Sequence, residues 1–217
     1  MRLTFTPRDA DIPRRKSFSR TVAFAIAFCL LSAASAVRAQ ESVVTLDPAR
    51  TGITFTLGAT LHTVHGTFKL KRGEIRFDPA TGKASGEIVV DTTSGDTGNS
   101  GRDNKMHKEI LESQKFPEAI FTPTMVKSQT PEIIPPEGSS KVDVSGVFRL
   151  HGQDHDMTLT FTVSKDAGPQ IQASTQFKIP YIQWGLKSPN TFVLHVSDTL
   201  DMEVHSQGKV SPATSSR

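Results

Sequence analysis

The sequence predicts an all-β protein, an antiparallel β-barrel of about eight strands with one short helix inserted. Apolar residues alternate with threonine and other polar residues at period two along most of the chain. These stretches are rich in Thr, Val, Ile and Phe, which fit the pleated, half-buried surface of a strand. Short clusters of Gly, Asp and Pro separate them and supply the residues that hairpin turns need.

Residues 1–39 are predicted to form a secretory signal peptide. Basic residues at 14–16 and 20 precede an apolar run at 22–31, and small residues follow up to Ala39. The run is too short for a membrane anchor, because a spanning helix needs about 20 apolar residues. We therefore expect a periplasmic or secreted protein with no integral membrane span after cleavage. The paired arginines leave Sec and twin-arginine export both open.

Removal of this segment changes the charge of the protein. The full chain has 25 basic and 22 acidic residues, of which residues 1–39 hold seven and two. The remainder has 18 basic and 20 acidic residues, and this net charge of −2 argues against nucleic-acid binding. The single cysteine, Cys29, also lies in the leader. The mature chain is thus expected to have no disulfide, thiol nucleophile or thiolate metal site.

The first strand is predicted where Ile53, Phe55 and Leu57 share one face and threonines share the other. A later segment, EAIFTPTMV, also has a strand pattern, and four more segments alternate as clearly as the first. Those four are residues 142–150, 157–163, 171–179 and 194–204. Strands with one apolar and one polar face are typical of antiparallel sheets.

The second strand changes phase along its length. Its apolar residues have even numbers at Phe68 and Leu70 but odd numbers at Ile75 and Phe77. In a regular strand one of these pairs would face solvent. We therefore expect a bulge or bend at Gly73.

Turns and loops separate the strands. Turn-forming residues at 78–83, 151–155 and 165–170 predict hairpins. Residues 129–141 contain three prolines and no periodicity, which predicts a longer loop. Residues 206–217 have the composition of a disordered tail.

Residues 40–205 are long enough for one domain with a single core. Closing the sheet into a barrel would pair every strand, and an eight-stranded barrel can be filled by side chains or hold one small ligand. An outer-membrane barrel is disfavoured because Tyr181 and Trp184 are the only Tyr and Trp available for aromatic girdles. Pro180 interrupts the strand before Trp184, which places Trp184 near a rim of the barrel.

A polar segment, residues 94–126, lies between two predicted strands. Ser100 and Asp103 have the spacing of a capping box, with Asp in place of Glu or Gln. Met106 and Ile110 then form a narrow apolar face at helical spacing. We predict a short helix that lies over one end of the barrel as a lid.

The histidines have two further chemical interpretations. His107 with Asp103 or Glu109 would be the acid–base pair of an enzyme acting on a hydrophobic or amide substrate at the barrel mouth. No activated Ser or Cys motif accompanies them, so we do not expect catalysis. His62 and His65 lie three residues apart on a strand and point to opposite faces, which makes them poor joint metal ligands. We expect no metal site and no cofactor.

Four segments in the same order resemble the YceI-like family of exported, lipocalin-like polyisoprenoid-binding proteins. They are TLDPARTGITFTL, SGDTGNSGRDNKMHKEILESQKFPEAIFTP, VSGVFRLHGQDHDMTLTFTV and FKIPYIQWGLKS. The second shows the family's Thr-Gly before an Arg-Asp pair, a helix, an aromatic-Pro pair and Ile-x-Phe. The resemblance covers about Val43 to His205. Arg50-Thr51 and Gly58-Ala59 stand where the family often has histidines, so no role of those histidines is carried over.

The resemblance implies a homodimer whose barrel lumen holds an isoprenoid or similar amphiphilic lipid chain, as a carrier or a reservoir, without catalysis. A barrel with a dry core that mediates only protein contacts is the other alternative. The residues expected to contact the lipid are Phe55, Leu57, Phe68, Phe77, Phe121, Phe148, Leu150, Leu159, Phe161, Phe177 and Trp184.

Overall fold

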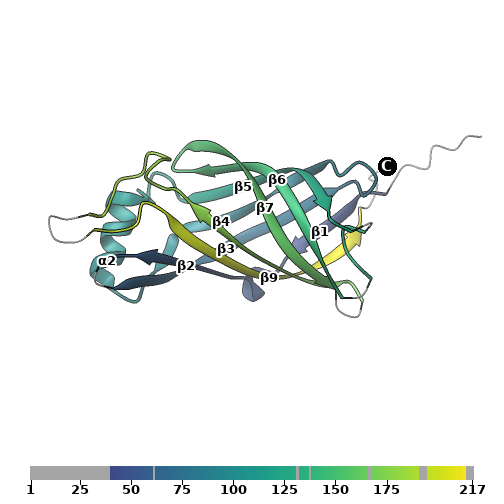
Figure 1. The fold of residues 1–217 in the computed structure, drawn as a ribbon, viewed down its shortest axis with the longest axis horizontal. Helices are drawn as coiled ribbons and strands as arrows, with labels where there is room; N and C mark the ends of the chain where they lie inside the picture. Colours follow the sequence, from purple (N-terminus) through teal and green to yellow (C-terminus); the bar gives the residue numbers. More distant parts are fainter. Residues whose placement is uncertain are drawn as a thin grey trace, which may run out of the picture. The chain divides into compact units, whose positions relative to one another are not determined.

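The computed structural model describes residues 40–213 except 61, 131, 137, 166–167 and 191–194. The predicted signal peptide lies outside the described residues. Within the described part, nine strands form one antiparallel sheet, and two short helical segments connect β4 to β5 (Figure 1). The strands are β1 (Ser42–Leu46), β2 (Gly52–Gly58), β3 (Thr63–Phe77), β4 (Ala84–Asp96), β5 (Glu118–Ser128), β6 (Ser139–Leu150), β7 (Gln153–Lys165), β8 (Gln170–Ile179) and β9 (Leu200–Pro212).

The sheet closes into a barrel. Each strand from β2 to β9 pairs with the next one in the chain, and β9 pairs with β2 and β1. β1 and β2 share one position between β3 and β9, because β2 pairs with one half of each neighbour and β1 with the other. A 3-10 helix, η1 (Pro48–Arg50), separates the two segments. The barrel therefore has eight strand positions, which confirms the predicted fold class.

The phase change in β3 is confirmed, but the bulge lies earlier than predicted. Leu70 pairs with Val90 and Arg72 pairs with Val89, so Lys71 is the extra residue. Gly73 lies two residues beyond the bulge and is buried, because the side chain of Leu46 lies over it. A Cβ atom on Gly73 would be 2.8 Å from Leu46 Cδ1, which explains the glycine without a bend.

The prediction of a disordered tail from Ser206 is wrong for residues 206–212. These residues form the second half of β9, which pairs with both β1 and β8. Ser206 is buried, and its hydroxyl donates to the carbonyl of Ala173 at 3.1 Å. A Cβ atom on Gly208 would be 2.5 Å from the carbonyl oxygen of Thr45, so a small residue is needed for this close strand contact. The Ser- and Gly-rich composition thus reflects tight pairing.

The predicted helix is present as α2 (Ser100–Lys105), which continues as a π-helix, η2 (Met106–Ile110), and lies at one end of the barrel (Figure 1). The cap is Asn99 rather than Ser100, since the Asn99 side chain accepts a bond from the backbone N–H of Arg102 at 3.0 Å. The segment ends before Glu112, which has a positive φ of 46°.

Candidate ligand cavity

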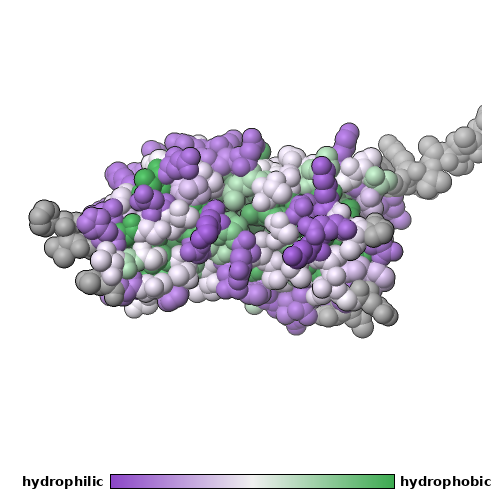
Figure 2. Space-filling view, viewed as in Figure 1, coloured by the Kyte–Doolittle hydropathy of each residue, from purple (hydrophilic) through white to green (hydrophobic). Residues whose placement is uncertain are grey.

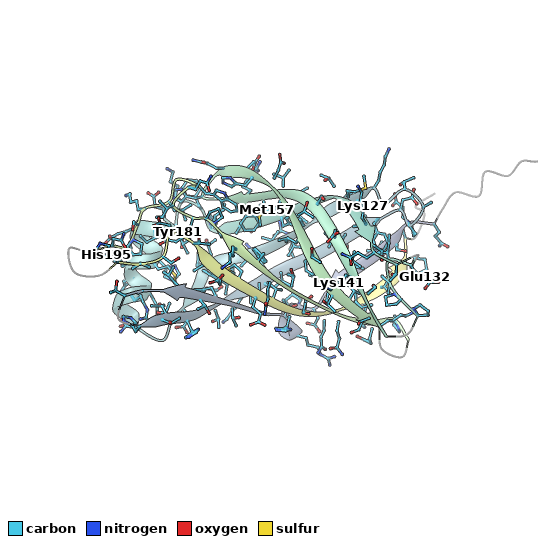
Figure 3. All side chains as sticks on the ribbon, in the orientation of Figure 1. Lys127, Glu132, Lys141, Met157, Tyr181 and His195 are labelled. Atoms are coloured by element: carbon cyan, nitrogen blue, oxygen red, sulfur yellow. The ribbon has the colours of Figure 1, made fainter. Side chains whose placement is uncertain are left out.

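The barrel encloses an apolar cavity of about 690 Å³. Its wall comes from β2 to β9 and from Leu46 of β1, and residues of α2, of η2 and of the segment after β8 line the end near the helix. Figure 3 shows Tyr181 at this end and Lys127, Glu132 and Lys141 at the other. On the face seen in Figure 2, most of the surface is hydrophilic (purple) or near neutral (white), and hydrophobic residues (green) show only in small patches. This is expected because alternate residues of each strand point outward and are mostly polar. The volume lies within the range of about 300–1,000 Å³ that is usual for small-molecule sites.

The structure places nine of the eleven predicted lipid-contacting residues on the cavity wall. Six of the nine are phenylalanines. The two residues that do not line the cavity are Phe77 and Trp184. Contact of the nine with a lipid stays a prediction.

The two residues that do not line the cavity lie in different places: Phe77 is buried and Trp184 is partly buried. Phe77 is 4% exposed at the end of β3 that is farther from α2, where the interior is filled. Trp184 lies in the segment after β8, with its ring stacked on His155 at 4.0 Å between centroids, and His155 shares the inward face of the sheet with its cross-strand partner Phe148. Its ring lies 5.9 Å from that of Phe148, which does line the cavity. Trp184 therefore packs beside the cavity at the end of the barrel without lining it.

The cavity occupies only one part of the barrel interior. We call the part that it occupies, next to α2, the cavity half, and the part beyond Leu46 the filled half. Ile133 and Ile134 of the loop after β5 pack against the core from the filled end, where the Ser140 hydroxyl donates to the carbonyl of Ile133 at 3.3 Å. The buried side chains of the filled half include Val44, Phe77, Val126, Val142, Val144, Val163 and Ile171.

Three inward-facing glycines hold phenylalanine rings against the wall of the cavity half. Gly66 lies directly opposite Phe55 in the β2–β3 pair, and a Cβ atom there would be 2.3 Å from Phe55 Cζ. A Cβ atom on Gly95 would be 2.7 Å from the Phe68 ring, and one on Gly146 would be 2.3 Å from the carbonyl oxygen of Thr122 and 2.9 Å from the Phe121 ring. Because each ring occupies the space of a missing side chain, it leaves the centre of the lumen open.

Sequence reasoning missed these glycines. Their signal was present, because a glycine inside a strand marks a bulge or a close approach of neighbouring atoms. The aromatic partner of each one depends on strand register, which the alternation alone does not specify.

Polar groups line the cavity at the helix end. Arg102 donates from Nε to Thr97 Oγ1 and from Nη2 to the carbonyl of Thr97, both at 2.8 Å. The Thr97 hydroxyl donates to Asp103 Oδ1 at 2.5 Å. Lys105 donates from Nζ to the carbonyl of Pro189 at 3.3 Å. Thr97, Arg102 and Lys105 all line the cavity, whereas Asp103 does not.

Tyr181 is a second polar contribution to the wall. Its side chain is buried, and its hydroxyl donates to the carbonyl of Ser197 at 2.7 Å. Burial, with the negative charge of Asp198 nearby, raises the pKa of Tyr181 to about 12. The phenol therefore stays neutral over the whole physiological pH range.

The residues of the enzymatic interpretation are not brought together as an acid–base pair. His107 donates from Nε2 to the carbonyl of Gly95 at 2.9 Å, and its Nδ1 lies 3.0 Å from the Ser113 hydroxyl. Asp103 accepts two bonds from Thr97, and Glu109 is exposed. None of the three lines the cavity. His107 instead ties the helical segment to β4, as a lid requires.

Metal-ligating residues show no cluster in the described part of the chain, where no group of three or more His, Cys, Asp or Glu could hold an ion. Both histidines are exposed, but only His62 also lines the cavity, whereas His65 Nδ1 lies 3.1 Å from the Thr56 hydroxyl. These two histidines therefore face different environments. Among the described helices, none has the length and apolar character needed to cross a membrane.

Comparison with known proteins gives consistent matches. A family model described as "YceI-like domain" matches residues 44–207. A UPF0312 protein of Pseudomonas savastanoi pv. phaseolicola is 28% identical over 194 residues, which cover 86% of this chain and 94% of that protein. Protein YceI of Escherichia coli O157:H7 is 33% identical over 100 residues, which cover 44% of this chain and 47% of that protein.

Two solved structures share the fold. A polyisoprenoid binding domain from Saccharophagus degradans, implicated in plant cell wall breakdown, has a TM-score of 0.62 at 18% identity, covering 77% of this chain and 98% of that one. BcnA of Burkholderia cenocepacia has a TM-score of 0.59 at 19% identity, covering 75% and 98%. At these identities the likeness concerns the arrangement of strands.

Proposed function

This chain belongs to the YceI-like family, and from that premise we propose that it is an exported, non-catalytic binding protein for a polyisoprenoid or similar amphiphilic lipid chain. The observation that carries the proposal is the 690 Å³ apolar cavity lined by six phenylalanines. A structural neighbour described as a polyisoprenoid binding domain supports this class of ligand. The apolar leader at residues 1–39 supports export, which fractionation of expressing cells would check.

The volume of the cavity suits a chain of intermediate length. The cavity is more than four times the size of an apolar cavity of about 150 Å³ that binds one benzene, so we expect room for roughly 20–25 carbon atoms. Each buried CH₂ contributes about 0.8 kcal/mol, so 15 buried carbons contribute roughly 12 kcal/mol before association costs of about 4–15 kcal/mol. Tight binding therefore needs a long chain and a preformed lumen.

A charge in the lumen tests the proposal. Phe161 lines the cavity, and its neighbour Thr162 is exposed on the other face of β7. Phe161→Asp should abolish lipid that co-purifies without detergent, as measured by native mass spectrometry, because a buried unpaired charge is costly. Thr162→Asp adds the same charge outside and should retain the lipid. Phe161→Ala should keep the fold and weaken binding.

Wild-type lipid occupancy in a folded Phe161→Asp protein would contradict the assignment of the lumen. Absence of any lipid from the wild-type protein, with no binding of added isoprenoid, would favour a barrel that mediates only protein contacts. Homodimer formation stays a prediction, which sedimentation equilibrium can check.

A further inference from the structure

The wall of the cavity half is not hydrogen-bonded evenly around the barrel. β7 pairs with β8 only over residues 162–165 and 171–174. Toward the helix end, residues 153–161 of β7 and 175–179 of β8 are all described, and no strand pairing joins them. On their other sides both strands stay paired, since β6 pairs with β7 as far as Gln153 and β9 pairs with β8 as far as Ile179. We call the two unpaired stretches the β7–β8 seam.

The seam lies directly beside the lumen. Leu159 and Phe161 on its β7 side line the cavity, and so do Phe177 and Ile179 on its β8 side. Strand edges that are held by side-chain contacts alone part at a lower free energy than edges joined by backbone hydrogen bonds. An apolar chain in the lumen is therefore separated from the outside, at the seam, by side chains only.

Two side-chain contacts close the ends of the seam. Toward the filled half, the Thr175 hydroxyl donates to the carbonyl of Thr160 at 2.8 Å, where a regular sheet would have a backbone bond. Toward the helix end, the ring of Trp184 stacks on that of His155 with an angle of 6° between the planes. Trp184 follows β8 whereas His155 belongs to β7, so this stack bridges the seam.

The closure at His155 leaves one polar atom unsatisfied. The Nε2 atom of His155 is buried and has no hydrogen-bond partner among the described residues. A buried polar atom without a partner destabilises the state in which it is buried. Movement of the Trp184 ring would bring this nitrogen into contact with water and so offset part of the stacking that is lost. The helix end of the seam is therefore the end that opens at the lower cost.

We propose, building on the proposed lipid-binding function, that the β7–β8 seam is a lateral gate through which the apolar chain of the ligand enters and leaves the lumen. The Trp184 ring moves off His155, and the two strands part while the paired residues 162–165 and 171–174 act as the hinge. A chain that passes sideways need not be threaded past the helical segment, which His107 ties to β4 through the carbonyl of Gly95.

A cross-link over the seam tests the gate. Counted from the Thr162–Ser174 pair, Thr158 lies opposite Lys178, and both side chains are exposed. Cys29 is the only cysteine, so Thr158→Cys with Lys178→Cys in a Cys29→Ser background admits a single link by a short bis-maleimide. The link should slow uptake and release of radiolabelled geranylgeraniol by similar factors of at least about tenfold. The equilibrium affinity should not change, because a gate alters the barrier and not the end states.

A matched pair separates the seam from the effect of cross-linking itself. Ser145 of β6 pairs with Thr158 on the side of β7 that is already hydrogen-bonded, and the two hydroxyls lie 2.9 Å apart. Ser145→Cys with Thr158→Cys, linked by the same reagent, should leave both rates unchanged. Both double variants should also show the wild-type rates before linking. Intact-mass spectrometry measures how completely each pair is linked.

Trp184→Ala should act in the opposite direction. Without the indole ring the helix end of the seam is no longer bridged, so uptake and release should both become several-fold faster. Trp184→Phe keeps an aromatic ring beside His155 and should produce a smaller increase. A purely structural role of Trp184 would instead weaken binding without faster uptake, and that result would count against the gate.

The outcomes separate the gate from the function on which it rests. Unchanged rates in protein fully linked across the seam, or an equal slowing by the link between positions 145 and 158, would overturn the gate and leave the lipid-binding function intact. Failure of delipidated wild-type protein to bind geranylgeraniol would overturn the lipid-binding function itself.

Discussion

The cavity half and the filled half of the barrel have the same alternating strands but differ in where their inward side chains lie. In the filled half, valines and isoleucines point at one another, and a loop adds Ile133 and Ile134 from the end. In the cavity half the side chains are larger, yet the space is open, because Phe55, Phe68 and Phe121 lie over glycines. Whether a part of this barrel is filled or open therefore depends more on where the phenylalanine rings point than on how large the inward side chains are.

The largest expected effect comes from removing the second half of β9, which helps to close the filled half. A chain that ends at His205 loses the pairing of β9 with β1 and part of its pairing with β8. We expect a loss of more than about 5 kcal/mol, enough to unfold a typical domain. Circular dichroism and urea unfolding measure it, with a chain that ends at Ala213 as the control. A native spectrum for the shorter chain would show that the filled half does not depend on closure.

Two isoleucines on one strand compare the halves directly. Ile171 and Ile179 are both in β8 and are 4% and 5% exposed, but only Ile179 lines the cavity. Ile171→Ala should lower the free energy of unfolding by about 2–5 kcal/mol. Ile179→Ala should cost roughly half as much, since a side chain beside a void already lacks contacts on that side. Equal losses in urea unfolding would mean that the two halves are packed alike.

Gly66→Ala should convert part of the cavity half into a filled one. The new methyl group would be 2.3 Å from the Phe55 ring and 2.7 Å from the carbonyl oxygen of Asp96, so we expect it to displace the ring toward the lumen and to strain the contact with β4, at a cost of about 1–3 kcal/mol in stability. Affinity for an isoprenoid should fall about tenfold, equivalent to about 1.4 kcal/mol. Adding Phe55→Leu should restore binding in part, because it relieves the contact with the ring but not the one with the carbonyl of Asp96, and Gly52→Ala, which meets no atom within 4 Å, should change nothing. Undiminished binding by Gly66→Ala would refute the role of the ring.

The smallest expected effect is the pH dependence that Tyr181 gives to the cavity half. Its pKa is raised from 10.0 to about 12, so between these values the unfolded chain loses the proton first. The contribution of the neutral Tyr181 phenol to the free energy of unfolding is fully present below pH 10. It falls by up to roughly 2 kcal/mol as the pH rises to 12. Tyr181 is the single tyrosine, so its absorbance titration is direct, and Tyr181→Phe should remove this part of the pH dependence. A midpoint near 10 would show that the phenol is hydrated.

The alternation predicted the barrel and most of the cavity wall because period two fixes which side chains face inward. The alternation does not predict where along the barrel the lumen ends. It therefore predicts that Phe77 faces inward, but not that Phe77 lies in the filled half and away from the cavity. The proline before Trp184 correctly predicted a position after the end of a strand, but not that the ring would stack on His155 instead of lining the cavity, because this depends on a loop conformation that no periodicity describes. Composition alone also misled at Ser206, because small residues serve close strand pairing as well as disorder.

The shared strand position of β1 and β2 has a consequence for how the chain folds. Ser42 pairs with Pro212, and the backbone N–H of Ala213 donates to the carbonyl of Glu41 at 2.7 Å, so the barrel closes through residues about 170 positions apart. Contacts this distant in sequence slow folding, because the entropy of loop closure is lost before the contacts form. The sheet cannot close until β9, the last strand in the sequence, is present to pair with β1 and β2. We therefore expect the enclosed lumen to form late in folding, with the apolar face open to water, to lipid and to other chains until β9 pairs with β1 and β2.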